Sequence, residues 1–283
     1  MDKYSDYHMH SLFSDGSASI DEMVESAIEK GLSQITITDH MPLPHATRYA
    51  MAYDKLALYR QTIREARLRF GSRLKINMGI EMEYIPQHSC WIEDISDMGW
   101  DHMIISVHAL FKGNCQAMVN GSAEEFNTLV ENFSYDVPSL CRAYYETLKQ
   151  GYRTGLFDIA GHMDVIKKHN VGEIFFRESD AHYRGLVLST LDVIREQGMK
   201  MEVNTAGFNH PVGRQYPSDW IIQAALEKEI PIVLSSDSHS PDTLGQYFDE
   251  IDSLAMVFYQ GINLGPRLKS STGHLEFNTS QFA

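Results

Sequence analysis

The sequence predicts an α/β fold built on a parallel sheet and contained in a single domain. Seven short segments rich in β-branched and apolar residues alternate with longer segments whose apolar residues recur at helical spacing. Such alternation implies parallel strands joined by crossover helices, in a barrel or an open sheet. The 283 residues contain no low-complexity stretch and no linker. We therefore expect one domain over residues 1–283.

The seven expected strands are short and bounded by loops. In chain order they cover residues 4–9, 34–38, 74–81, 102–108, 157–161, 199–204 and 231–236. The second strand, QITIT, is a clear example, because Gly31 precedes it and a loop with Pro42 and Pro44 follows it. These boundaries place the end of each strand beside polar residues.

Amphipathic helices are expected between the strands, over residues 19–31, 54–70, 138–148 and 183–197. Ser19 and Glu22 form a capping box at the start of the first helix. Residues 109–133 depart from the alternation, although Ser122 and Glu125 form a second capping box within them. This segment is the longest departure from the pattern, and whether it forms a lid stays open.

Charge and composition exclude several classes of protein. The chain has 24 Lys and Arg against 38 Asp and Glu, a formal net charge of -14, which opposes binding to nucleic acid. It contains no run of about 18 apolar residues to cross a membrane, and its N-terminus lacks a secretory signal. Three cysteines without C-x-x-C spacing indicate reduced thiols. We therefore expect a cytoplasmic protein.

Polar side chains stand at the carboxyl end of every expected strand. In chain order they are His8 and His10 with Asp15, Asp39 with His40, Glu81, His108, His162, Glu202 with Asn204, and Asp237 with His239. In parallel barrels and open sheets alike, ligands and catalytic groups gather at these ends, because the loops that leave the strands open there. Seven separate strands therefore direct polar groups toward one place.

Residues two apart on a strand point to the same face and can bind one metal ion together. His8 and His10 have this spacing, and Asp237 and His239 repeat it at the last strand. A mixed histidine and carboxylate set without cysteine suits zinc, iron or manganese. Buried charges are costly unless paired or bound to metal, so the pattern predicts more than one divalent ion. The other histidines are interpreted as surface or otherwise satisfied residues: His45, His88, His102, His169, His182, His210 and His274.

A series of motifs along the chain indicates a known superfamily. They are His8-Met9-His10, Ser14-Asp15-Gly16, Thr38-Asp39-His40, Gly79-Ile80-Glu81, Ser106-Val107-His108, Gly161-His162-Met163-Asp164 and Ser236-Asp237-Ser238-His239. In this order, from residue 4 to about residue 245, the chain resembles the polymerase and histidinol phosphatase (PHP) superfamily. The resemblance implies a distorted seven-stranded (β/α)7 barrel of the TIM type and a centre of three divalent metal ions.

The same resemblance implies which residues bind the ions. The first ion would be held by His8, His10, Glu81 and Asp237, the second by Asp15, His40 and His239, and the third by His108 and His162 with Glu81 as a bridge. Clustered divalent ions lower the pKa of a shared water and hold phosphoryl oxygens. The expected reaction is therefore hydrolysis of a phosphoric monoester by a metal-bridging hydroxide.

A narrower resemblance concerns the substrate. Residues 202–208, followed by Pro211, are similar to the branch of the superfamily that hydrolyses L-histidinol phosphate in histidine biosynthesis. Relatives often have a lysine just before this proline, whereas Asn209 and His210 precede it here. Another monoester, such as a phosphotyrosine protein or a nucleotide, therefore stays open as the alternative substrate.

A phosphate monoester brings about two negative charges, so cations outside the metal centre would help to position it. The candidate substrate-binding residues are Lys167, Lys168, Arg214 and Asn204. Asn204 is equally a candidate for the cap of the following turn. Asp237 and His239 are the candidates for protonating the leaving alkoxide, and the sequence does not rank them.

Two other functions compete with a phosphatase. An exonuclease, like the PHP domains attached to bacterial polymerases, is disfavoured because a polymerase region is missing and the chain is acidic. An inactive metal-binding scaffold would be expected to lack ligands, yet every implied ligand is present. We expect an enzyme acting on a small-molecule phosphate monoester, with no nucleic acid or membrane partner. The identity of the metals and the oligomeric state stay open.

Overall fold

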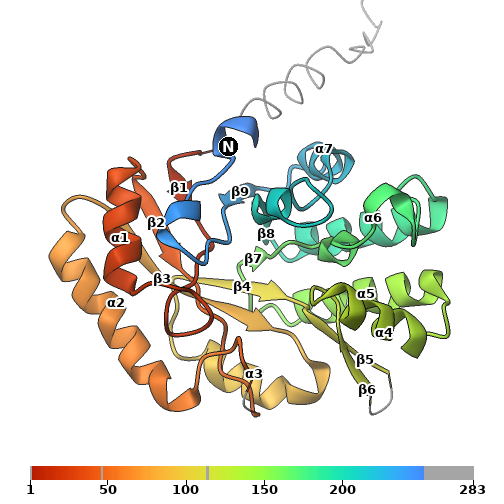
Figure 1. The fold of residues 1–283 in the computed structure, drawn as a ribbon, viewed down its shortest axis with the longest axis horizontal. Coiled ribbons are helices and arrows are strands. Elements are labelled where there is room, and N and C mark those ends of the chain that lie inside the picture. The colour runs from red at the N-terminus through yellow and green to blue at the C-terminus, as the bar shows by residue number, and fades with distance from the viewer. Residues whose placement is uncertain (1, 46, 113–114, 252–283) are drawn as a thin grey trace, which may run out of the picture.

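Seven parallel strands form the centre of the molecule (Figure 1). Neighbouring strands are hydrogen-bonded in the order β1 (Ser5–Asp6), β2 (Gln34–Ile37), β3 (Lys75–Glu83), β4 (His102–Ser106), β7 (Ile159–Ala160), β8 (Lys200–Asn204) and β9 (Ile232–Ser235). Every pair in this order is parallel. The computed structural model describes residues 2–45, 47–112 and 115–251 of the chain.

The two outer strands approach each other and nearly close the sheet into a barrel. The backbone N–H of Tyr7 donates to Leu234 O at 3.3 Å, and that of His10 donates to Ser238 O at 2.8 Å. Met9 and Ser238 form an isolated parallel bridge. Because these few bonds replace a regular ladder, the barrel is distorted where β1 meets β9. The expected seven-stranded (β/α) barrel is confirmed.

Helices cover the outside of the sheet (Figure 1). They are α1 (Ile20–Glu29), α2 (Leu56–Phe70), α3 (Ser89–Ser96), α4 (Ala123–Asn132), α5 (Val137–Tyr152), α6 (Ala181–Glu196) and α7 (Asp219–Glu227). Short 3-10 helices are η1 (Tyr53–Lys55), η2 (Pro86–His88), η3 (Val165–Lys167), η4 (Val171–Glu173), η5 (Ala206–Asn209) and η6 (Pro241–Thr243). The expected amphipathic helices are confirmed as α1, α2, α5 and α6. The sequence pattern does not predict α3 and α7, whose 8 and 9 residues give too few turns for clear periodicity.

Apolar side chains from the strands and from the inner faces of the helices form the core. Ile35, Ile37 and Ile80 on the strands and Tyr59 and Ile63 on α2 are fully buried. Burying a side chain of this size stabilises the fold by roughly 1.5–3 kcal/mol. This packing holds the strands, and therefore the side chains at their ends, in fixed relative positions.

Two antiparallel strands and a helix lie beside the barrel in the described part of residues 109–133. Strand β5 (Ala109–Lys112) pairs antiparallel with β6 (Cys115–Met118), and α4 follows. The capping box of Ser122 and Glu125 is present at the start of α4. Asn120, between β6 and α4, lines the pocket at the strand ends. The segment therefore borders that pocket, and whether it acts as a lid stays open.

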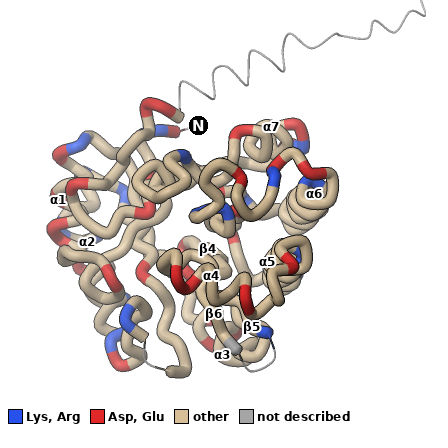
Figure 2. The backbone as a smooth tube through the Cα atoms, turned by 45° about the vertical axis from the view of Figure 1, so that its right-hand side comes forward, with Lys and Arg blue, Asp and Glu red and all other residues tan. Residues whose placement is uncertain are grey.

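Acidic and basic residues are interspersed over the outer helices (Figure 2). Within the part of the chain that the structure describes, no helix combines the length and the apolar character needed to cross a bilayer. The prediction of a single domain extends over residues 252–283 and over His274, which lie outside the described residues.

Candidate metal centre

The carboxyl ends of the strands surround one pocket of about 200 Å³. The residues implied as metal ligands lie in its wall or directly behind it: His8, His10, Asp15, His40, Glu81, His108, His162, Asp237 and His239. They follow or belong to β1, β2, β3, β4, β7 and β9. The barrel thus brings together side chains that are far apart in the sequence.

Glu81 lies at the centre of this cluster. Its Oε2 is 2.8 Å from His40 Nδ1 and 3.4 Å from His8 Nε2. Its Oε1 is 3.2 Å from His162 Nε2 and 3.3 Å from His108 Nε2. The side chain projects from β3 and is only 1% exposed. Because its two oxygens face different histidines, this carboxylate is placed to bridge two ions.

His8 and His10 follow β1 and meet Asp237, which follows β9. His10 Nε2 lies 3.1 Å from Asp237 Oδ1 and 3.7 Å from Glu81 Oε2. His8 Nε2 lies 3.6 Å from the same oxygen of Asp237. His8, His10 and Glu81 hold ligand atoms within 4.8 Å of one another. The residues implied for the first ion therefore meet, as the spacing of two residues between the histidines predicts.

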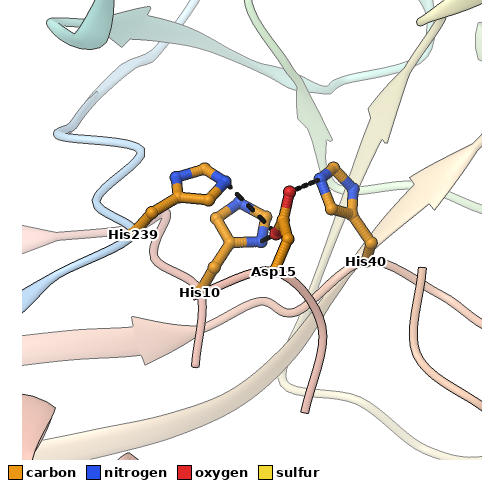
Figure 3. A group of neighbouring side chains, drawn as sticks. All are labelled: His10, Asp15, His40 and His239. Carbon is orange, nitrogen blue, oxygen red and sulfur yellow. Dashed lines mark ion pairs between the residues drawn. The ribbon is translucent and has the colours of Figure 1, made fainter. Parts of the chain in front are cut away.

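A second group of ligand atoms surrounds Asp15 (Figure 3). His10, Asp15, His40 and His239 hold ligand atoms within 4.8 Å of one another. Asp15 Oδ1 lies 3.3 Å from His239 Nε2, and Asp15 Oδ2 lies 3.7 Å from His40 Nε2. The rings of His10 and His239 are stacked with centroids 4.1 Å apart. The residues implied for the second ion meet here, and His10 lies between the first and second groups.

His108 and His162 face each other beside Glu81. Their Nε2 atoms are 3.2 Å apart, a distance at which two imidazole nitrogens share a proton or a cation. Ser106 Oγ donates to Glu81 Oε1 at 2.6 Å and fixes that oxygen. His40 also has a ligand atom within 4.8 Å of Glu81 and His108. The residues implied for the third ion therefore meet, with His40 between this group and the second.

Two further carboxylates orient the histidines from behind. Glu202 Oε1 lies 2.6 Å from His8 Nδ1, and Glu83 Oε2 lies 2.6 Å from His108 Nδ1. A carboxylate at Nδ1 fixes the tautomer that leaves the Nε2 lone pair free for a metal ion. The sequence analysis identifies Glu202 at a strand end but does not identify Glu83. Glu83 lies two residues after Glu81 on the same strand, and this spacing indicates that both side chains point to the same face.

The donor set fits divalent metal ions. His8 Nε2 and Glu81 Oε2 are buried and make no hydrogen bond, since the nearby His40 Nδ1 and His8 Nε2 approach Glu81 Oε2 without hydrogen-bond geometry. Across residues 2–45, 47–112 and 115–251, no lysine or arginine forms an ion pair with Asp15, Glu81 or Asp237. Because buried carboxylates are costly without compensating positive charge, this cluster requires positive charge that the side chains of lysine and arginine do not supply.

The charges within the cluster shift its pKa values strongly. Burial opposes the charged form of His8, but the carboxylates of Asp237 and Glu202 raise its pKa well above the ordinary value. Burial also opposes ionisation of Glu81, but His40 and His8 lower its pKa well below the ordinary value. Without metal, His8 therefore carries a proton beside an ionised Glu81, in the position where a metal ion would provide the positive charge.

Asp39 belongs to a strand-end motif but supports a loop. It is fully buried. Its Oδ1 accepts from the backbone N–H of Ser11 at 2.8 Å and of Ser14 at 3.0 Å, and the hydroxyls of both serines donate to its carboxylate. These bonds fix the loop after β1, and that loop carries Asp15.

The rest of the pocket wall includes Asn120, Lys168, His210 and Tyr216. Lys168 donates to Asn120 O, and burial lowers the pKa of Lys168. His210 Nδ1 lies 3.1 Å from Tyr216 Oη. Burial and the nearby Lys168 lower the pKa of His210 to about 4, so its ring is neutral at pH 7. His210, interpreted from the sequence as a surface or satisfied residue, is satisfied by Tyr216 and also lines the pocket, which its place just before Pro211 indicates only weakly.

The other candidate substrate-binding residues do not line this pocket. Lys167 is fully buried and lies 2.8 Å from Asp164 Oδ2. Arg214 is exposed and lies outside the pocket wall. Asn204 is buried, donates from Nδ2 to Asp237 Oδ2 at 3.0 Å, and accepts at Oδ1 from the following turn. Asn204 therefore caps the following turn and orients the carboxylate of Asp237, whereas its binding of substrate stays a prediction.

Comparison with known proteins places the chain in a family. The model of the PHP domain matches residues 6–206. The chain belongs to the PHP family. A curated PHP relative from Deinococcus radiodurans, named "Probable histidinol-phosphatase", is 33% identical over 247 residues, covering 86% of this chain and 89% of the relative. The histidinol-phosphatase of Bacillus subtilis is 28% identical over 266 residues, covering 86% of this chain and 96% of the relative.

A solved structure shares the fold of this PHP protein. It is the histidinol phosphate phosphatase of Lactococcus lactis subsp. lactis, complexed with zinc, L-histidinol and phosphate. The two structures agree with a TM-score of 0.72 at 22% sequence identity, over 90% of this chain and 94% of the other. The likeness shows that the nearly closed seven-stranded barrel is common to both proteins.

Proposed function

We propose that this PHP protein is a metal-dependent histidinol-phosphatase, which converts L-histidinol phosphate and water into L-histidinol and phosphate. The observation that carries the proposal is the position of Glu81, whose carboxylate lies within 3.4 Å of four imidazole nitrogens. The two curated relatives with this name, at 33% and 28% identity over most of the chain, support the substrate.

The proposed cofactors are three divalent ions of zinc, iron or manganese. Their proposed ligands are His8, His10, Glu81 and Asp237 for the first, Asp15, His40 and His239 for the second, and His108, His162 and the bridging Glu81 for the third. The zinc in the Lactococcus lactis enzyme supports this class of metal. Bound ions would supply Lewis acidity and lower the pKa of a water to near neutrality.

The chain itself contributes a cation and a proton donor. Lys168 lines the same pocket as the proposed ligands, and its ammonium group is placed to bind phosphoryl oxygens. Asp237 Oδ1 and His239 Nδ1 lie 3.8 Å apart in the wall, so either group reaches the region of the leaving oxygen. We propose that one of these two residues protonates the leaving alkoxide from the atom that does not bind a metal ion.

The size of the pocket supports a small metabolite as substrate. Its volume of about 200 Å³ is below the roughly 300–1,000 Å³ typical of pockets for drug-sized ligands. We propose neither a nucleic acid nor a membrane as a binding partner. The free cysteines Cys90 and Cys141 support a cytoplasmic location.

Phosphate release by the metal-loaded protein tests the proposal. We expect kcat/KM for L-histidinol phosphate to exceed that for p-nitrophenyl phosphate by at least about a hundredfold, because binding of the correct leaving group contributes to catalysis. Elemental analysis of the same sample should find three ions per chain. Removing the ions with a chelator should abolish turnover, and zinc or manganese should restore it.

Matched variants separate the residues within the site. Asp237→Asn should lower kcat by more than about a hundredfold with an unchanged circular dichroism spectrum, since it removes a proposed ligand. Lys168→Met should raise KM, whereas Arg214→Met, which removes a cation outside the pocket, should not.

Equal kcat/KM values for the two esters would reject L-histidinol phosphate as the specific substrate and would indicate a general phosphoric monoesterase. Ion binding without phosphate release from any monoester would indicate a scaffold.

A further inference from the structure

A buried ion pair lies behind the pocket wall. Lys167 Nζ is 2.8 Å from Asp164 Oδ2, and both side chains are fully buried. The two residues belong to the segment that follows β7, at η3. The same segment contributes Val165 and Lys168 to the pocket wall. The ion pair is therefore adjacent to the proposed phosphate-binding lysine without itself lining the pocket.

Lys167 also contacts the 205–218 loop, which we define as the residues between β8 and α7. Its ammonium donates to Gln215 O at 3.0 Å and to Ser218 Oγ at 2.6 Å. It also lies 5.4 Å from the centre of the Tyr216 ring. One buried cation thus joins the end of this loop to the segment after β7.

Asp164 makes a second connection to the same loop. Its Oδ2 accepts from the backbone N–H of Ser218 at 2.9 Å, while its Oδ1 is buried without a hydrogen-bond partner. A buried ion pair adds little net stability, because desolvation offsets the attraction between the charges. The unpaired oxygen increases that cost. A contribution to overall stability therefore explains this pair poorly, and a single fixed arrangement of the two segments explains it better.

Contacts within the 205–218 loop connect its end, which Lys167 holds, to the part that lines the pocket. Asn204 and Tyr216 exchange two backbone hydrogen bonds, of 2.6 and 2.8 Å, at the base of the loop. His210 Nδ1 lies 3.1 Å from Tyr216 Oη, and both residues line the pocket. A Cβ on Gly207 would lie 2.2 Å from Arg214 O, so the two sides of the loop are in direct contact.

We propose that Asp164 and Lys167 are positioning residues for substrate selection. They hold the 205–218 loop at a fixed distance from Lys168. At that distance the loop contacts the leaving group while Lys168 binds the phosphate. This inference rests on the proposed histidinol-phosphatase function. It predicts an effect on KM and on the choice between esters rather than on kcat. The reason is that the side chains of this pair bond to the loop and not to the proposed metal ligands.

The test uses the full-length, metal-loaded protein and the double variant Asp164→Asn with Lys167→Met, which removes both charges and leaves no unpaired ion. We expect amide exchange in residues 205–218 to accelerate at least about tenfold. We also expect KM for L-histidinol phosphate to rise about tenfold with kcat within about threefold, and KM for p-nitrophenyl phosphate to change less. Ser218→Ala, which removes one hydrogen bond of Lys167 and the 3.4 Å hydrogen bond to Asp164 Oδ2 but leaves both charges, should show the same pattern more weakly.

Lys149→Met is the matched control. Lys149 is also buried and paired, with Glu146 Oε1 at 2.7 Å, but its ammonium group joins α5 to Ser189 of α6, and neither hydrogen bond leads to the pocket. It should leave KM, ester choice and exchange in the loop unchanged.

Unchanged exchange and KM in the folded double variant would overturn the inference, as would a fall in kcat with KM unchanged. Failure of the wild-type protein to hydrolyse either ester would reject the proposed function. Amide exchange in residues 205–218, compared between the double variant and Lys149→Met, would then test by itself whether the ion pair holds the loop.

Discussion

At the residue scale, the metal centre depends on carboxylates that hold the histidines from behind. Glu202 accepts on both oxygens, from the His8 ring at 2.6 Å and from the backbone N–H of His162 at 2.5 Å. It therefore connects the proposed first and third ion sites without facing the pocket. A glutamine at this position can offer only one acceptor oxygen, so one of the two donors must face an amide N–H₂ group.

Glu202→Gln is predicted to lower metal affinity by roughly 10- to 100-fold, because His8 loses the partner that fixes its tautomer. The measurement is titration of metal-free protein with manganese, followed by turnover at saturating metal. The control is Glu178→Gln, which changes a carboxylate that accepts from Trp220 Nε1 at 2.8 Å, away from the centre. Wild-type affinity in Glu202→Gln would show that this carboxylate does not support the ligand.

At the scale of the elements, neighbouring strands approach closely where they carry the ligands. Gly161, between β7 and His162, illustrates this. A Cβ at this position would lie 2.6 Å from Ser106 Oγ and 2.7 Å from Ile104 Cγ2 on β4. Ser106 is the residue that donates to Glu81. The absence of a side chain at one position thus allows two strands to set the orientation of a carboxylate on a third.

Gly161→Ala is therefore predicted to destabilise the protein by roughly 1–3 kcal/mol through overpacking and to weaken metal binding by displacing Ser106. Urea unfolding and manganese titration measure the two effects. Gly185→Ala provides the control, because Gly185 lies within α6 and a Cβ there would meet nothing within 4 Å. That exchange should stabilise the protein by about 0.5–1 kcal/mol. Equal effects of the two exchanges would contradict the close approach of β4 and β7.

At the scale of the whole molecule, the cluster couples folding to pH and to metal. Burial opposes the charged form of His239, but the hydrogen bond with Asp15 and the charge of Asp237 raise its pKa to about 9. Burial likewise opposes protonation of His108, but Glu81 and Glu83 raise its pKa well above the ordinary value. Because an unfolded histidine titrates near 6.5, the metal-free folded state holds extra protons above that pH.

The stability of the metal-free protein is therefore predicted to fall as pH rises from about 6.5 to 9, since the protons that the folded state gains are lost over that interval. Metal ions bind only the deprotonated ligands, so stabilisation by metal should grow over the same interval. Calorimetric Tm values with manganese and with a chelator, from pH 6 to 9.5, measure both trends. A constant difference between the two Tm curves would contradict the protonated cluster.

The sequence by itself determined the parallel α/β class, the main helices and the set of residues directed toward one end of the barrel. These features follow from local periodicity and from the rule that side chains at the ends of parallel strands share one edge. The spacing of His8 and His10 was sufficient to predict that they act together, because side chains two residues apart on a strand share a face.

Only the tertiary structure decided which polar residues face the pocket and which support it. Lys167 and Lys168 are neighbours in the sequence, yet one is paired with Asp164 and the other lines the pocket with His210. Loops have no period from which the direction of a side chain follows. That direction depends on hydrogen bonds and packing between segments that meet only when the barrel has formed.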